Sequence, residues 1–209
     1  MEQIQNIGLF VTLSWLLIIS PGPDSIFVLT KGISGGKKAG LVSAFGVTLG
    51  ILVHTTFAAF GLSVILQTSA MAFEIIKYTG AAYLIFLGVQ ALIKRQQVET
   101  QPNTHTSSRK TLYSALLTNV LNPKVGLFFI AFLPQFISPE TQTEAAFPFI
   151  LLGGTFAIFT FLFLALLALL SATLGKWFLE KSVAGKYLQK ITGLAFIALG
   201  LRLALTDRN

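Results

Sequence analysis

Six long apolar stretches divide this chain of 209 residues, and each is long enough to cross a lipid bilayer. A helix needs about 20 apolar residues to span the hydrocarbon core, because it rises about 1.5 Å per residue. Only 11% of the residues are charged, against about 25% in an average soluble domain. We therefore predict an all-α membrane protein with six transmembrane helices. They fall at roughly residues 4–30, 39–66, 71–93, 112–137, 145–173 and 187–206.

The first stretch is interrupted by the segment Pro21-Gly22-Pro23-Asp24. The two prolines lack backbone donors and cannot continue a helix without strain, whereas Gly22 permits a turn that other residues adopt at a cost. Proline suits the first position of a helix. We therefore expect Pro23 to begin a half-helix whose free N–H groups point into the bundle and attract negative charge.

The fourth stretch is interrupted in the same way at Asn122-Pro123-Lys124. Asn is a favoured N-cap residue and Pro a favoured first residue, so a second half-helix should begin here. A simple proline kink is the alternative, and many membrane helices tolerate one. A kink alone does not explain Asp24 in one break and Lys124 in the other, because ionisable residues inside a membrane usually have a function.

Three roles are open to Asp24 and Lys124. They could form a structural ion pair, they could bind the ammonium and carboxylate of a zwitterion, or Asp24 could carry a proton in a coupled transport cycle. An unpaired charge inside the membrane is costly, so in the empty protein we expect the two side chains to pair with each other or with water.

His54, in the second stretch, is a candidate proton relay, because histidine titrates near neutral pH. A neutral histidine that bonds to a neighbouring helix is the interpretation we favour. No second ligand stands four residues away, so no metal site is expected. The chain has no cysteine and no phosphate-binding loop, and it presents no convincing nucleophile with a base. We predict no enzymatic activity and no cofactor.

Basic residues predict the orientation in the membrane. They concentrate in the first, third and fifth links, which the positive-inside rule places in the cytoplasm, so both termini should lie outside. The net charge of +7 is explained by this pattern and does not require nucleic acid as a partner. The basic residues of these links are Lys31, Lys37, Lys38, Lys94, Arg95, Arg109, Lys110, Lys176, Lys181, Lys186 and Lys190.

The start of the chain lacks a basic region and a cleavage pattern, so we do not expect it to be a signal peptide.

The two halves of the chain resemble each other. Each has three stretches and opens with a broken one, and Thr79-Gly80 in the third stretch matches Thr192-Gly193 in the sixth. Three helices per half reverse the second half in the membrane, which predicts inverted repeats with a transport site near the midplane. We expect one transmembrane domain over residues 1–209. Repeat one covers about 1–93, a cytoplasmic loop about 94–111 and repeat two about 112–209.

Gly46 and Gly50 form a GxxxG pattern, which lets helices approach closely. Packing within the chain is the favoured role, and a homodimer contact is the alternative.

Several of these motifs together resemble the LysE/RhtB family of bacterial amino-acid exporters, over nearly the whole chain. The resemblance implies six spans in two inverted halves, and export from the cytoplasm across the cell membrane driven by an ion gradient. It also implies that Asp24, Asn122, Lys124 and the prolines beside them form the functional centre. We expect the proton to be the coupling ion. The motifs are Ser20-Pro21-Gly22-Pro23-Asp24, Gly46 with Gly50, Tyr78-x-Gly80-Ala81-x-Tyr83-Leu84, Asn122-Pro123-Lys124, Phe128-Phe129 and Phe132-Leu133-Pro134-Gln135-Phe136.

Two other functions remain open at this point. A divalent-metal exporter would need several acids or histidines within the spans, and Asp24 is the one clear acid. A membrane protein that only assembles with a partner would need no transport site. Among amino acids we favour neutral ones, because a cationic substrate calls for a second carboxylate in the membrane, and Glu74 sits at the end of a stretch.

Overall fold

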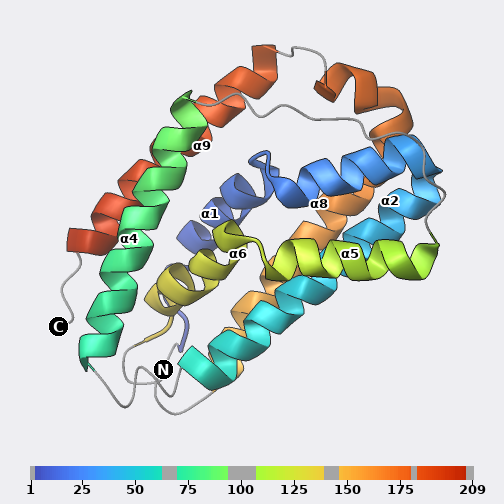
Figure 1. Ribbon diagram of the computed structural model, residues 1–209. Helices are drawn as coiled ribbons and strands as arrows, with labels where there is room; N and C mark the ends of the chain where they lie inside the picture. Colours follow the sequence, from blue (N-terminus) through green and yellow to red (C-terminus); the bar gives the residue numbers. More distant parts are fainter. Residues whose placement is uncertain (1–2, 63–69, 94–106, 139–145, 180–182, 206–209) are drawn as a thin grey trace.

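The computed structural model describes residues 3–62, 70–93, 107–138, 146–179 and 183–205. Within these ranges the chain is helical apart from short connections, and it contains no β-strand (Figure 1). An isolated antiparallel bridge joins Ile4 to Ile137. The prediction of an all-α protein is therefore confirmed.

The helices differ widely in length. In chain order they are α1 (Ile7–Ile19), α2 (Pro23–Phe57), the π-helical turn η1 (Ala58–Leu62), α4 (Ala70–Ile93), α5 (Ser108–Val120), α6 (Pro123–Leu127), the π-helical turn η2 (Phe128–Phe132), the 3₁₀ turn η3 (Leu133–Phe136), α8 (Phe147–Leu179) and α9 (Val183–Leu205).

The loop predicted at about residues 94–111 overlaps the first turn of α5. Helix α5 begins at Ser108, because the Ser107 side chain caps it by accepting a hydrogen bond from the Lys110 N–H at 3.4 Å. The first turn of this helix is polar, so the pattern of apolar residues in the sequence does not show where the helix begins. The rest of that loop, residues 94–106, and the chain ends, residues 1–2 and 206–209, lie outside the described residues.

Length and composition mark several helices as able to cross a membrane. Pro23–Gly61 and Phe147–Ser171 each qualify as single helices. Ser108–Val120 and Pro123–Phe136 qualify together as one broken span that bends by 47°. Ile7–Ile19 and Lys77–Ile93 are shorter apolar helices. This is the helix content of a membrane protein.

Helix α2 reverses its direction at Gly36. This glycine adopts φ 78° and ψ 177°, a conformation that residues with a Cβ rarely adopt. A Cβ placed on Gly40 would lie 3.1 Å from the Cα of Gly32, although residues eight apart in a continuous helix are separated by about 12 Å. The chain therefore folds back between the first two predicted stretches.

Small residues let the second part of α2 pack closely against α5. A Cβ on Gly46 would lie 2.6 Å from the backbone oxygen of Leu112, and one on Gly50 would lie 2.6 Å from Asn119 Oδ1. The contacts advance in the same direction along both helices, so this part of α2 and α5 run parallel. The predicted packing role of the two glycines within the chain is confirmed.

Helix α8 packs on α2 in the antiparallel direction. A Cβ on Gly40 would lie 2.8 Å from Ala168 Cβ, and one on Gly153 would lie 2.9 Å from Thr55 Cβ. Helices α4 and α9 form a second antiparallel pair. There, a Cβ on Gly88 would lie 2.6 Å from the backbone oxygen of Gly193, and one on Gly200 would lie 2.7 Å from that of Ala81.

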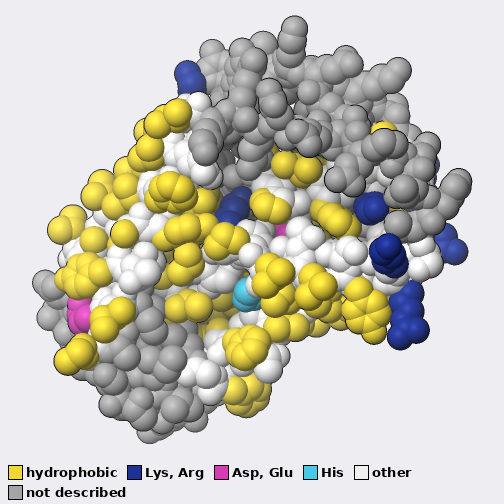
Figure 2. Space-filling model, viewed as in Figure 1, with side chains coloured by type: hydrophobic (Ala, Val, Ile, Leu, Met, Phe, Trp, Pro, Cys, Tyr) yellow, Lys and Arg dark blue, Asp and Glu magenta, His cyan; other side chains and the backbone are white. Residues whose placement is uncertain are grey.

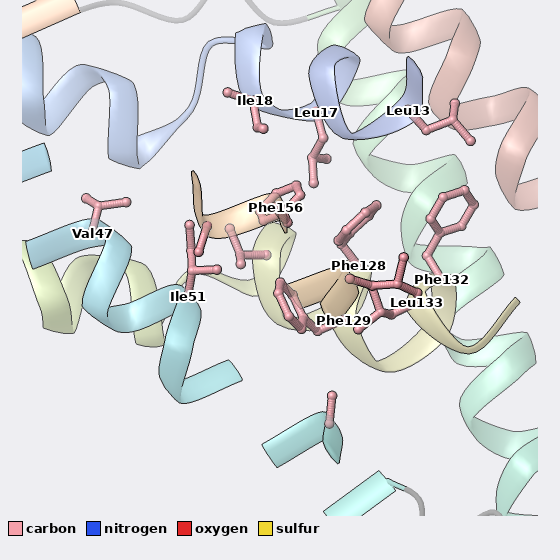
Figure 3. Packing of buried hydrophobic residues seen from close by; sticks show 14 of the residues in the cluster. Leu13, Leu17, Ile18, Val47, Ile51, Phe128, Phe129, Phe132, Leu133 and Phe156 are labelled. Atoms are coloured by element: carbon pink, nitrogen blue, oxygen red, sulfur yellow. The ribbon is translucent and has the colours of Figure 1, made fainter. Parts of the chain in front are cut away.

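A cluster of phenylalanines fixes the segment that follows α6. The rings of Phe128 and Phe156 stack with centroids 4.9 Å apart (Figure 3). The ring of Phe132 meets that of Phe136 edge-on, with centroids 5.0 Å apart. Phe129 is also fully buried in this cluster. Because η2 follows α6 directly, the packed rings hold the second break in place.

Apolar side chains cover much of the outer surface (Figure 2). Phe57 is 70% exposed and Leu121 75% exposed. Exposing so many apolar side chains to water would be costly, whereas exposing them to lipid is favourable. Lys and Arg side chains gather at one end of this face, where α5 begins and α2 reverses (Figure 2). The protein is a membrane protein.

Candidate functional site

The first break separates α1 from α2 as its prolines predict. Ser20 is the C-cap of α1, Gly22 is the extended N-cap residue of α2, and Pro23 is the first helical residue. Asp24 therefore lies in the first turn of α2, where the helix dipole favours a negative charge.

The second break has the same design. Asn122 is the N-cap of α6, and its Oδ1 accepts a hydrogen bond from the Lys124 N–H at 3.0 Å. Pro123 is the first residue of α6, as predicted. Lys124 lies in the first turn of α6, where the helix dipole disfavours a cation. Its ammonium group must therefore be stabilised by groups outside α6.

Those groups lie at the end of α1. Lys124 Nζ donates to the backbone oxygens of Leu17 at 3.0 Å and Ser20 at 3.1 Å. In a continuous helix the oxygen of Leu17 would accept from residue 21, but Pro21 has no N–H to give. The proline thus leaves a free acceptor at a helix C-terminus, where a lysine is electrostatically favoured.

Asp24 is held by two amides from the other break. Its Oδ2 accepts from Asn119 Nδ2 at 2.9 Å and from Asn122 Nδ2 at 3.0 Å. Its Oδ1 is buried and has no hydrogen-bond partner, and the same is true of Asn119 Oδ1. Buried acceptors without a partner are rare in proteins. The Asp24 carboxylate therefore has one oxygen available to accept a hydrogen bond from a bound molecule.

The sequence predicted that Asp24 and Lys124 pair with each other or with water, and within the described residues no direct hydrogen bond or salt bridge joins the two side chains. Asn122 links them instead, since its Nδ2 donates to Asp24 while its Oδ1 accepts from the Lys124 backbone. The charges are close enough to interact through space.

His54 lies on α2 beside the second break. Its Nε2 is 3.2 Å from the backbone oxygen of Asn119, and because that oxygen has no proton, the histidine nitrogen donates. In a continuous helix this oxygen would accept from residue 123, which is proline. His54 thus bonds to a neighbouring helix, as the favoured interpretation predicted, and it bonds at the break.

Gly22 and Gly126 lie beside the charged groups at distances that would still leave room for a methyl group. A Cβ on Gly22 would lie 3.5 Å from Lys124 Nζ, and one on Gly126 would lie 3.4 Å from His54 Cε1.

A small cavity opens beside these groups. It measures about 30 Å³, room for a water molecule or two but not for an amino acid. One wall is polar and comes from both breaks, while Ile51, Phe156 and Leu164 supply apolar surface. The polar wall contains Ser20, Gly22, Asp24, Ser25, Asn122, Lys124 and Thr160.

Sequence reasoning missed Asn119, which is fully buried and contacts both Asp24 and His54. The available signal was a second amide one helical turn before Asn122, since residues three apart share a helix face.

Two broken membrane helices bring a carboxylate, an ammonium group and backbone carbonyls to one buried cavity. This is the arrangement of a membrane transporter. The sequence profile of the LysE type translocator family matches residues 15–207. The chain belongs to this family, whose members are transport proteins and not enzymes.

Several relatives resemble the chain over nearly its whole length. It is 30% identical over 207 residues to the uncharacterized membrane protein YrhP of Bacillus subtilis (strain 168), which covers 94% of this chain and 97% of that protein. It is 30% identical over 204 residues to the leucine efflux protein of Enterobacter sp. (strain 638), covering 96% of both chains. It is 32% identical over 196 residues to the homoserine/homoserine lactone efflux protein of Salmonella typhimurium, covering 93% of this chain and 94% of that protein. No solved structure matches the chain.

Proposed function

We propose that this protein exports neutral amino acids or close derivatives across the bacterial cytoplasmic membrane, driven by the proton gradient. The observation that carries the proposal is the pairing of Asp24 with the second break and of Lys124 with the first. Together they place opposite charges beside one cavity, which complements the two charges of a zwitterion, although the cavity must widen to admit an amino acid.

The names of the relatives support the substrate class. One is named for leucine and another for both homoserine and its lactone. These three compounds share an ammonium group and carry no net positive charge on the side chain, whereas the lactone lacks a free carboxylate. Recognition of the ammonium group is therefore the common requirement. A site with a single membrane carboxylate can balance the charge of one ammonium group, which favours substrates with a neutral side chain.

Contacts between helices support the proposed six spans in two inverted repeats. Gly40 packs on Ala168, and Gly153 packs on Thr55. Gly40 and Gly153 are separated by the same number of residues as Thr55 and Ala168, so each contact is the counterpart of the other in the opposite half.

The second antiparallel pair of helices gives the same relation. Gly88 packs on Gly193, and Gly200 packs on Ala81. Gly88 and Gly200 are separated by the same number of residues as Ala81 and Gly193. Such reciprocal contacts are expected from a two-fold axis in the membrane plane.

The arrangement of basic residues supports the proposed orientation. Lys38 from the first link and Arg109 from the third line one groove between α2 and α5, so these two links lie at the same end of the bundle. We assign this end to the cytoplasm and both termini to the outside.

Within the described residues, no three His, Asp or Glu side chains come together, so the divalent-metal exporter has no supporting observation. An assembly partner without transport activity is the remaining competitor. Purified protein in liposomes loaded with labelled leucine decides between them. We expect release to accelerate when a proton gradient is imposed and to slow when an ionophore removes it. Equal release from protein-free liposomes would contradict the proposal.

A further inference from the structure

We propose that the backbone oxygens of Leu17 and Ser20 form the subsite for the substrate's ammonium group, and that the Lys124 side chain fills this subsite when no substrate is bound. The inference rests on the proposed function and specifies which chemical group the first break recognises.

The acceptors exist because of the prolines. Pro21 gives the Leu17 oxygen no backbone partner, and the Ser20 oxygen follows the end of α1. A bare carbonyl inside a membrane is costly, so each must find a donor from elsewhere. In this structure a single ammonium group serves both, at 3.0 and 3.1 Å.

The surroundings of Lys124 Nζ suit any primary ammonium. The ring of Phe196 from α9 lies 5.7 Å from the nitrogen, within the range of a cation–π contact. Two carbonyls, an aromatic face and a carboxylate nearby are the groups that recognise an ammonium ion. The α-ammonium of an amino acid carries the same three donors as the lysine side chain.

The neighbouring groups allow an exchange of one ammonium for the other. The unpaired Oδ1 of Asp24 and both carbonyl residues belong to the same cavity. If the lysine side chain swings out, it vacates space that adjoins this cavity and it remains beside the substrate's carboxylate. The carbonyls are then never left without a donor, and the buried charges stay balanced throughout.

Three probes separate the contributions of the ammonium and the carboxylate. Leucine carries both groups, leucine methyl ester carries only the ammonium, and N-acetylleucine carries only the carboxylate. Titration calorimetry at pH 6 on purified protein in lipid nanodiscs measures their Kd values. We expect the wild-type protein to bind leucine and its ester, and to bind N-acetylleucine about tenfold or more weakly.

Two variants then test the subsite. Lys124→Gln removes the internal occupant, so the ester should bind equally or more tightly while leucine binds about tenfold or more weakly. Pro21→Ala restores the missing N–H to the Leu17 oxygen, so leucine and the ester should both bind about tenfold or more weakly. Pro148→Ala, at the start of α8 and outside the cavity lining, is the matched control and should change neither Kd.

The results separate the inference from the proposed function. Leucine binding to the wild type, combined with an equal loss of ester and leucine binding in Lys124→Gln, overturns the inference and leaves the function standing. Unchanged ester binding in a folded Pro21→Ala protein also overturns it. A wild-type protein that binds neither leucine nor the ester contradicts both.

Discussion

Asp24 and Lys124 occupy the same position in their two helices, and each bonds to the break that belongs to the other. Both are the second residue of a helix that begins with proline. Asp24 accepts from Asn119 and Asn122 at the second break, while Lys124 donates to Leu17 and Ser20 at the first. Any displacement of one broken helix relative to the other therefore changes the bonding of both charges at once.

The orientation gives the first prediction. A tag placed between residues 96 and 106 should be labelled only from the cytoplasm, and a tag at residue 209 only from outside, because the basic links stay inside. Membrane-impermeant labelling of intact cells and of inverted vesicles measures this. The reverse pattern would show that the assignment of inside and outside is wrong.

The second prediction uses the two adjacent glycines of α8. Gly153→Ala places a methyl group against Thr55 and should lower the melting temperature of the purified protein, at a cost of about 1–3 kcal/mol for overpacking. Gly154→Ala is the matched control, because no atom lies within 4 Å of the added Cβ, and it should be neutral. Equal melting temperatures for the two variants would remove the close packing of α8 on α2 as a source of stability.

Much of this architecture could be predicted from local rules. Pro23 and Pro123 mark helix starts because proline lacks a donor and has a helical φ, and Asn122 is a cap because its side chain is short and polar. The close approach at Gly46 and Gly50 follows from residue size. These signals need no knowledge of the partner helix.

The contacts between the breaks could not be predicted in the same way. The carbonyls that accept hydrogen bonds from Lys124 are determined by how α1 packs against α6. The opposite charges alone predicted that Lys124 pairs with Asp24 or with water. Asn119 was missed because its position one turn before Asn122 does not reveal that it faces Asp24, which depends on how α5 packs against α2. The start of α5 at Ser108 was missed because its first turn is polar.

His54 provides the third prediction. Its Nε2–H donates to the Asn119 backbone oxygen at 3.2 Å, and the Asn122 N–H donates to the same oxygen at 2.9 Å, so His54 supplies an additional donor at the break. His54→Gln keeps an N–H donor and should retain leucine efflux within about threefold of wild type, whereas His54→Leu should lower stability by about 0.5–1.5 kcal/mol because it removes one hydrogen bond while the carbonyl keeps another. Loss of proton-driven efflux in a stable His54→Gln protein would instead assign the proton relay to this residue.

The fourth prediction concerns the interaction between the two charges. Asp24→Asn and Lys124→Gln each leave one charge in the bundle without its opposite, whereas the double variant leaves none. Thermal unfolding of the four proteins should therefore show the double variant less destabilised than the sum of the single variants. We expect a coupling of about 1 kcal/mol, since the two side chains bond to different partners and not to each other. Strict additivity would mean that the two sites act independently.

The last prediction tests the role of the carboxylate in transport. Asp24→Asn keeps the size of the side chain and an oxygen that accepts from Asn119 and Asn122, so the protein should fold and insert normally. It removes the negative charge and the group that can take up a proton, so net leucine efflux driven by a pH gradient should be abolished.

Exchange of labelled for unlabelled leucine at equal pH on both sides then separates the two possible roles of Asp24. If Asp24 carries the coupling proton, exchange should survive in Asp24→Asn, because exchange needs no net proton movement. If Asp24 holds the substrate's ammonium, exchange and leucine binding should fail together. Ser25→Ala, the next residue along α2 and also part of the cavity lining, is the control for a substitution that leaves the charge in place. Wild-type net efflux by a well-folded Asp24→Asn protein would refute the assignment of the transport site to the two breaks.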